Sequence, residues 1–187
     1  MSGLQYAASN TKIVTLISRP RLLTSISWSP DNNTFVYDSE NRVYIYDIGA
    51  KTQRLLAEGS APAWSPNGLW IAYRSPDGKA VTINPRTSET KVLLGGRKIE
   101  WGIHWSPDSR YVMVAEMKNY ALDILHNPFD DRTRKMVIYR LEDGAKLSGE
   151  WFPGPGIADR GYYWVKDHRA FLKGASSHPT ISPCNGY

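Results

Sequence analysis

The sequence SWSPD at Ser27–Asp31 returns twice along the chain. Ala63–Asn67 contains AWSPN and His104–Asp108 contains HWSPD, so the copies follow one another at intervals of about 40 residues. A β-rich run follows each copy: NTFVYDS, then LWIAYRS, then RYVMVAE. Self-similarity at such a period indicates a repeat architecture, in which each unit buries its apolar face only against its neighbours. The repeat therefore decides the fold.

A fourth, weaker copy is aligned by its tryptophan. It has the sequence WVKDHRAFLKG, which lacks Ser-Pro but keeps an aspartate at the third position after the tryptophan and an aromatic residue at the seventh. Packing between units must recur, whereas contacts with a ligand have no reason to, so we expect the repeated indoles to fill the seams between units. The predicted structural frame consists of Trp28, Trp64, Trp105 and Trp164 with Asp31, Asn67, Asp108 and Asp167.

Each unit has the pattern of four short strands. In the Ser-Pro-Asp/Asn turn, proline presets φ and the Asx side chain accepts a local backbone hydrogen bond. After the β-rich run, a second turn (SENR or SPDGK) leads into VYIYDI or AVTINP, and TQRLLA or TKVLLG ends the unit. Four strands in about 40 residues make one propeller blade. We predict an all-β fold, a β-propeller of about four four-stranded blades with almost no helix.

These units resemble the WD40-like β-propeller repeat of the TolB type, also called PD40. Its pattern is W-S-P-D-G, an alternating strand, I/V-Y-x-x-D and a closing L-L or L-T, and the resemblance covers about Leu23–Gly174. Asn32 and Ser109 stand where the pattern has a turn glycine, and Asn84-Pro85 replaces the strand-ending aspartate. The family includes periplasmic protein-binding propellers and the non-catalytic caps of serine peptidases. The resemblance therefore implies a bacterial-type scaffold that binds protein.

The chain is predicted to be one domain, 1–187, with blade units near 23–57, 58–95, 96–150 and 151–187. An open row of blades would expose strand edges and two apolar faces. Residues 1–22, which contain KIVTLI, could supply a closing strand to the fourth unit. Alternatively, two copies could form a homo-oligomer that completes a larger ring with two-fold symmetry, or the chain could be part of a longer propeller. The sequence leaves these three alternatives open.

The third unit carries a long insertion, Met117–Lys135, between its second and third strands, where the other units have four or five residues. This connection is expected at the end of the ring where the links between blades lie. Long loops on a rigid scaffold are common sites of function. We predict that a protein or peptide partner binds there, through Tyr120, Asp123, His126, Phe129, Asp130, Asp131, Arg132 and Arg134 of the insertion and Arg97, Glu100, Asp159 and Arg160 of the links.

Searches for catalytic motifs find none. The sequence has no G-x-S-x-G elbow, H-E-x-x-H pair or phosphate-binding loop. We predict a non-catalytic protein with no catalytic residues, no metal ligands and no cofactors. One alternative is a metal-assisted lyase or hydrolase in the channel of a completed ring, using His104, His126 and the carboxylates of the insertion. Another is a truncated, inactive propeller fragment.

The composition narrows the possible partners. The formal net charge of the 187 residues is +5, but the basic residues are scattered, which is typical of a solvated surface and does not favour nucleic acid. No apolar run approaches the length needed for membrane insertion. The single cysteine, Cys184, excludes an internal disulfide. No signal peptide is recognisable, so we expect a cytoplasmic protein, or a periplasmic one if the chain is a processed form.

Overall fold

A computed structural model describes residues 4–8, 12–17, 23–93, 99, 102–117, 134–152, 162–164, 170–173 and 180–183. Side chains are described for 25–93, 99, 102–116 and 137–146. In these residues the regular structure consists of antiparallel strands, and no helix occurs. No candidate membrane-spanning helix is found in this part of the chain.

Three four-stranded sheets form the central part of the molecule, and within each the strands pair in chain order. The first sheet contains β3 (Leu23–Trp28), β4 (Thr34–Ser39), β5 (Arg42–Asp47) and β6 (Thr52–Glu58). The second contains β7 (Ser60–Trp64), β8 (Ile71–Arg74), β9 (Ala80–Ile83) and β10 (Thr90–Val92). The third contains β11 (His104–Trp105), β12 (Tyr111–Met117), β13 (Arg134–Arg140) and β14 (Lys146–Phe152).

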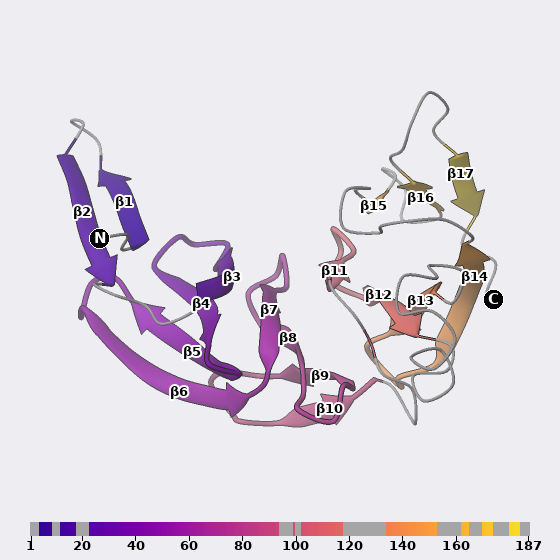
Figure 1. Ribbon diagram of the computed structural model, residues 1–187, viewed down its shortest axis with the longest axis horizontal. Coiled ribbons are helices and arrows are strands. Elements are labelled where there is room, and N and C mark those ends of the chain that lie inside the picture. The colour runs from indigo at the N-terminus through magenta and orange to yellow at the C-terminus, as the bar shows by residue number, and fades with distance from the viewer. Residues whose placement is uncertain are drawn as a thin grey trace, which may run out of the picture.

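Two smaller sheets lie at the two ends of the arc along which the sheets follow one another (Figure 1). The N-terminal sheet contains β1 (Leu4–Ala8) and β2 (Lys12–Ile17). The C-terminal sheet contains β15 (Tyr162–Trp164), β16 (Ala170–Lys173) and β17 (Thr180–Pro183).

The pairing of β2 differs from the closing-strand alternative. β2 carries the segment KIVTLI, and it pairs with β1 in the register Tyr6↔Val14, whereas β17 pairs with β16. Closing a short local hairpin costs less loop entropy than a pairing between distant parts of the chain. The sequence analysis did not identify Leu4–Ala8 as a strand, so it missed this nearer partner.

The Ser-Pro-Asp/Asn turns share one hydrogen-bond pattern. In the first, Ser29 Oγ donates to Asp31 Oδ1 at 2.6 Å and accepts from the Thr34 amide at 3.0 Å, while the Ser29 amide donates to Thr34 O at 2.9 Å. Ser65 and Ser106 make the equivalent bonds in the next two sheets. All three serines are buried. The repeated serine thus satisfies the polar groups of a buried turn.

The turn position that the repeat pattern gives to glycine has a left-handed backbone conformation in all three copies. Its φ is 57° at Asn32, 71° at Gly68 and 61° at Ser109. Asparagine tolerates this region, whereas serine pays a steric cost of about 1 kcal/mol or more. The substitutions at Asn32 and Ser109 therefore leave the turn unchanged in shape.

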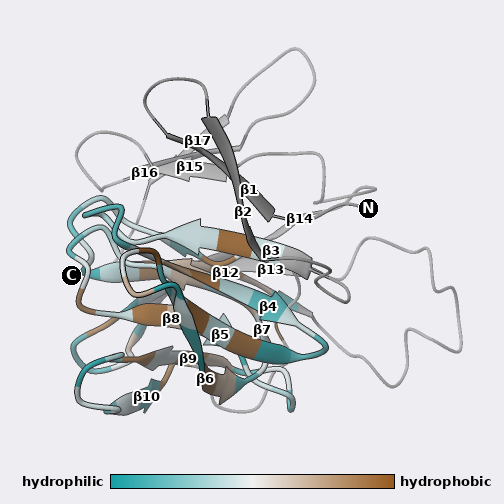
Figure 2. Ribbon diagram, turned by 90° about the vertical axis from the view of Figure 1, so that its left-hand side faces the viewer, coloured by the Kyte–Doolittle hydropathy of each residue, from teal (hydrophilic) through white to brown (hydrophobic). Residues whose placement is uncertain are grey.

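Two of the core clusters lie in the seams between consecutive sheets, and a third, aromatic cluster lies on the first sheet. In the first seam, Val36 and Val43 of the first sheet pack with Ile71 and Val81 of the second. A second cluster joins the second and third sheets. Figure 2 shows hydrophobic residues on the strands and hydrophilic residues at many of the connections. Burial of aliphatic side chains between sheets is the main stabilising contribution in such a stack.

Candidate interaction surface

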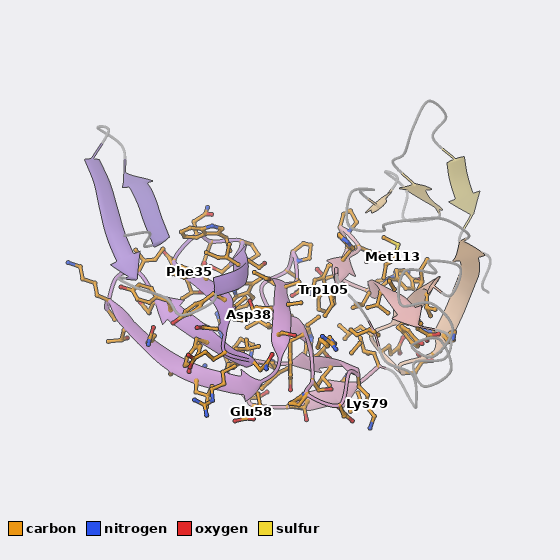
Figure 3. The ribbon with its side chains drawn as sticks, in the orientation of Figure 1. Phe35, Asp38, Glu58, Lys79, Trp105 and Met113 are labelled. Carbon is orange, nitrogen blue, oxygen red and sulfur yellow. The ribbon has the colours of Figure 1, made fainter. Side chains whose placement is uncertain are left out.

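Two tryptophans of the repeat frame, Trp64 and Trp105, lie at the seams between described sheets, as the sequence predicts. Trp64 packs on the cluster between the first and second sheets, and Trp105, which is 8% exposed, belongs to the cluster between the second and third (Figure 3). The Trp105 Nε1 donates to Ala63 O of the preceding sheet at 2.9 Å. Trp28 packs on an aromatic cluster of the first sheet. The side chains of Trp164 and Asp167 lie outside the described residues.

One end of the stack, which we call the insertion rim, is defined by two hydrogen bonds. The Gly59 amide, in the link between the first and second sheets, donates to Asn41 O in the β4–β5 turn at 2.7 Å. The Ile99 amide, in the next link, donates to Gly78 O in the β8–β9 turn at 2.7 Å. The second-to-third strand connections therefore lie beside the links between sheets, as the sequence predicts.

The long insertion starts from this rim. β12 and β13 remain paired up to Met117↔Arg134, so these two residues and Lys135, included in the predicted insertion, belong to the ladder. The connecting residues are 118–133, which lie outside the described part of the chain. Of the predicted partner-binding residues, only the backbone of Arg134 is described. The others, which lie outside, are Tyr120, Asp123, His126, Phe129, Asp130, Asp131, Arg132, Arg97, Glu100, Asp159 and Arg160.

A buried carboxylate sits at the base of the insertion. Glu116, the penultimate residue of β12, is 1% exposed, accepts a hydrogen bond from the Tyr139 hydroxyl and pairs with Lys146 Nζ at 3.0 Å. The Glu116 backbone also forms a bridge with Ile99 of the preceding link. A buried charge must be paired to persist, and removing its partner is strongly destabilising. These contacts therefore join the end of β12 to β13, to β14 and to the link between the second and third sheets.

The sequence analysis did not identify Glu116, Tyr139 or Lys146. The available signal was the alternation of β12: Val112, Val114 and Glu116 share one face, and the first two are fully buried. A glutamate in register with two buried valines predicts a buried carboxylate that needs a basic partner.

The β8–β9 turn adds a second charge pair to the insertion rim. Lys79 Nζ lies 2.8 Å from Asp77 Oδ2, and Ser75 Oγ also donates to the Asp77 carboxylate. The Lys79 hydrogen bond, followed by that of Ser75, lowers the pKa of Asp77 to about 2. This carboxylate is therefore ionised throughout the neutral range.

His104 points to the side of its strand opposite Trp105, because its β12 partner is Met113 while the partner of Trp105 is Val112. Burial lowers the pKa of the His104 imidazole, which favours its neutral form. A Cβ on Gly102 would lie 2.9 Å from His104 Nε2, so glycine gives the ring its space. In the part of the chain that the structure describes, no group of three His, Cys, Asp or Glu side chains is placed to hold a metal ion.

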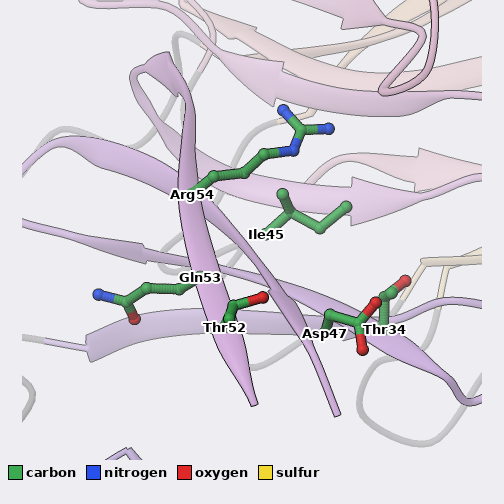
Figure 4. A pocket seen from close by; sticks show the side chains of 6 residues that line it. All are labelled: Thr34, Ile45, Asp47, Thr52, Gln53 and Arg54. Carbon is green, nitrogen blue, oxygen red and sulfur yellow. The ribbon is translucent and has the colours of Figure 1, made fainter. Parts of the chain in front are cut away.

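A small hollow of about 290 Å³ lies on the first sheet, near the ends of strands β5 and β6 (Figure 4). Arg54 on its wall donates to Pro85 O in the β9–β10 turn at 2.7 Å, and Asp47 accepts a hydrogen bond from the Ala50 amide at 2.8 Å. Both charged side chains of the hollow therefore form hydrogen bonds with nearby main-chain groups. The lining residues, which the sequence analysis did not identify, are Thr34, Ile45, Asp47, Thr52, Gln53 and Arg54.

Solved structures share this arrangement of sheets. TolB from Acinetobacter baumannii matches 98% of this chain and 47% of its own with a TM-score of 0.61 and 16% identity. The fold is that of a β-propeller. A putative TolB from Agrobacterium tumefaciens matches 74% of this chain and 53% of its own (TM-score 0.57, 22% identity). An acylaminoacyl peptidase from Pyrococcus horikoshii matches 86% and 32% (TM-score 0.61, 16% identity).

The predicted propeller fold and its resemblance to the TolB type are therefore confirmed at the level of the fold. The chain spans about half the length of the two TolB structures that it matches. No protein-family model and no curated protein sequence matches it.

Proposed function

We propose that the chain is a non-catalytic β-propeller scaffold that binds a protein or peptide partner through its insertion rim. The observation that carries the proposal is the position of the long connection 118–133. It leaves a complete β12–β13 ladder at Met117↔Arg134, on the rim where the links and second turns of the other sheets converge.

The base of the connection suits a recognition loop. Glu116 and Tyr139 form a buried hydrogen-bonded pair at the end of the ladder from which the connection leaves, and the partly exposed Lys146 pairs with Glu116. A rigid support reduces the conformational entropy that binding must offset.

The composition of the connection fits protein recognition. It contains Tyr120 and Phe129 as aromatic anchors, together with the charged run Asp130-Asp131-Arg132. Aromatic residues and arginine are enriched where binding energy concentrates in protein interfaces. The resemblance to TolB-type propellers, a family that includes protein-binding members, supports the same reading.

The test replaces residues 118–133 by Asn-Gly. This two-residue turn closes an antiparallel pair such as Met117↔Arg134 without altering its register. Peptides are first selected from a displayed random library on the intact chain, and their affinities are then measured by fluorescence polarisation. The shortened chain should keep its melting temperature and lose at least about tenfold in affinity, since loop anchors of this kind contribute more than about 1.4 kcal/mol.

A matched control lies on the opposite end of the third sheet. Arg110, whose side chain is 69% exposed, follows the Ser-Pro-Asp turn of that sheet. Arg110→Ala should leave the affinity of the selected peptides unchanged. Equal binding by the intact and shortened chains would remove the insertion rim from the proposal.

A further inference from the structure

Two residues occupy the same position in the first two repeats but carry opposite charges. Asp38 is the tenth residue after Trp28, and Arg74 is the tenth residue after Trp64. The first and second strands pair in the same register in both sheets, counted from these tryptophans. Asp38 and Arg74 therefore lie at the same level of their sheets, at the end of β4 and β8 that leads to the insertion rim.

Asp38 faces the second sheet and is bound there. It shares a strand face with Val36, which packs in the seam between the first and second sheets. Asp38 is 3% exposed, and its Oδ2 accepts a hydrogen bond from the Ala61 amide of β7 at 3.2 Å. Ala61, the third residue before Trp64, has a left-handed backbone with a φ of 52°. In this seam, an amide donor of the later sheet thus meets a carboxylate of the earlier sheet.

The next seam has the equivalent amide but a different side chain opposite it. Gly102, the third residue before Trp105, corresponds to Ala61 and is also left-handed, with a φ of 79°. Arg74 shares a strand face with Ala72, which packs in the seam between the second and third sheets. The repeat geometry therefore directs the Gly102 amide toward the Arg74 guanidinium, and both groups are hydrogen-bond donors.

Neither donor has an acceptor in the described part of the chain. Arg74 Nε is buried without a hydrogen-bond partner, and the guanidinium forms no ion pair with a described residue. The Gly102 amide forms no hydrogen bond with a described residue either. Both residues are partly exposed, so the site is open to a ligand. A buried polar group without a partner is costly, and a bound acceptor would remove that cost for both donors.

Other basic side chains beside the turns of this rim do have acidic partners. Arg42, which follows the β4–β5 turn, lies 3.7 Å from Glu58, and Lys79 of the β8–β9 turn lies 2.8 Å from Asp77. Arg74 differs from these two residues because its charge is not balanced by a neighbouring carboxylate of the described chain. An acidic ligand would supply that carboxylate.

We propose that the Arg74 guanidinium and the Gly102 amide bind a carboxylate of the partner, supplied either by an acidic side chain or by a chain terminus. The inference rests on the proposed function, since it names the chemistry of the peptide that the insertion rim binds. The ligand's carboxylate takes the place that the Asp38 carboxylate has in the preceding seam, where it accepts from the Ala61 amide. The guanidinium adds charge-assisted hydrogen bonds, which are stronger than those between neutral groups.

Nuclear magnetic resonance of the complete chain tests the site with two small carboxylates. N-acetyl-aspartic acid amide presents a side-chain carboxylate, and N-acetylalanine presents a terminal one. N-acetyl-asparagine amide and N-acetylalanine amide are their neutral controls. At least one carboxylate should shift the Gly102 amide resonance until the shift saturates, whereas the neutral compounds should leave it unchanged. The carboxylate that binds more tightly identifies which part of a peptide the site receives.

Arg74→Gln should weaken carboxylate binding by about tenfold or more, because the charge-assisted hydrogen bonds are lost. Arg74→Met repeats the test with an apolar side chain, and it should also keep the melting temperature of the intact chain, since no described hydrogen bond is removed. Arg86→Gln is the matched control. Arg86 is exposed in the β9–β10 turn, at the opposite end of the same sheet, so this change should leave binding unaltered.

A Gly102 resonance that responds to neither carboxylate, or that responds equally in the intact chain and in both Arg74 variants, would overturn the inference. A stronger response to inorganic phosphate than to either carboxylate would overturn it as well. These measurements do not involve the exchange of residues 118–133. If peptide affinity survives that exchange while Gly102 still responds to a carboxylate, the proposed function fails and the carboxylate site stands.

Discussion

Asn67 and Ser109, which belong to neighbouring repeats, are joined by a hydrogen bond from the Asn67 main-chain amide to Ser109 Oγ at 3.0 Å. Ser109 is 3% exposed and has a φ of 61°. This serine therefore compensates for its unfavourable backbone conformation with a contact that a glycine could not make.

Ser109→Ala should lower the free energy of unfolding by about 1 kcal/mol, because the Asn67 amide loses its acceptor on the neighbouring repeat. Ser88 provides the control, since it has a φ of 63° but is exposed. Ser88→Ala should change stability by less than about 0.5 kcal/mol. Urea unfolding followed by circular dichroism measures both, and equal losses would show that the interrepeat bond contributes nothing.

Gly59→Ala should be among the most destabilising single changes in the described chain. Gly59 has a φ of 147°, and a Cβ there would lie 2.3 Å from Arg74 O and 2.8 Å from Tyr73 Cδ2. Strain and steric overlap together should cost about 3 kcal/mol. At Gly49 the nearest atom to a new Cβ is Asp47 Oδ1 at 3.5 Å, so Gly49→Ala should be tolerated. Similar melting temperatures for the two variants would contradict this account.

Trp105→Phe should cost more than Trp64→Phe. Trp105 Nε1 donates to Ala63 O, whereas Trp64 Nε1 is buried with no hydrogen-bond partner among the described residues. The first change leaves a carbonyl without its donor, and the second removes an unsatisfied donor. The difference in unfolding free energy should be about 1 kcal/mol or more. The result that would count against this is a larger loss for Trp64→Phe.

His104 should make folding sensitive to mild acid. Burial holds the pKa of the folded-state imidazole below 6.5, so the unfolded chain binds a proton more readily as the pH falls through that value. The stability contributed by neutral His104 is fully present above pH 6.5, and it is lost as the pH falls from 6.5 through the lower pKa of the folded state. His104→Gln should flatten the decline in melting temperature between about pH 7 and pH 5. Parallel curves for both proteins would exclude the effect.

The sequence predicted the fold because the repeat constrains many positions at once. Trp28, Trp64 and Trp105 set the register of the first strand in each sheet, and the Ser-Pro-Asx turn that follows sets where the second begins. Strand alternation then placed His104 and Trp105 on opposite sides of β11. These features are local, so periodicity and turn chemistry suffice to find them.

Features that depend on distant partners were not found. Glutamate is a residue type that usually lies on the surface, and Glu116 can be buried because it contacts Tyr139 and Lys146 on other strands. The pairing of β2 was also missed, since KIVTLI is compatible with any open strand edge. Pairing of this kind is decided by the geometry of the whole chain, which a periodic pattern does not contain.

On the insertion rim, hydrogen bonds anchor the links between sheets to the hairpin turns, whereas the loops on this rim can differ in length and sequence. The pairing of the strands and the anchoring of the described links do not depend on the residues of a loop on that edge. A loop grafted there can be lengthened or exchanged while the inner packing keeps its register. The rim is thus the place where new specificity can evolve on this protein, or be engineered into it, at little cost to folding.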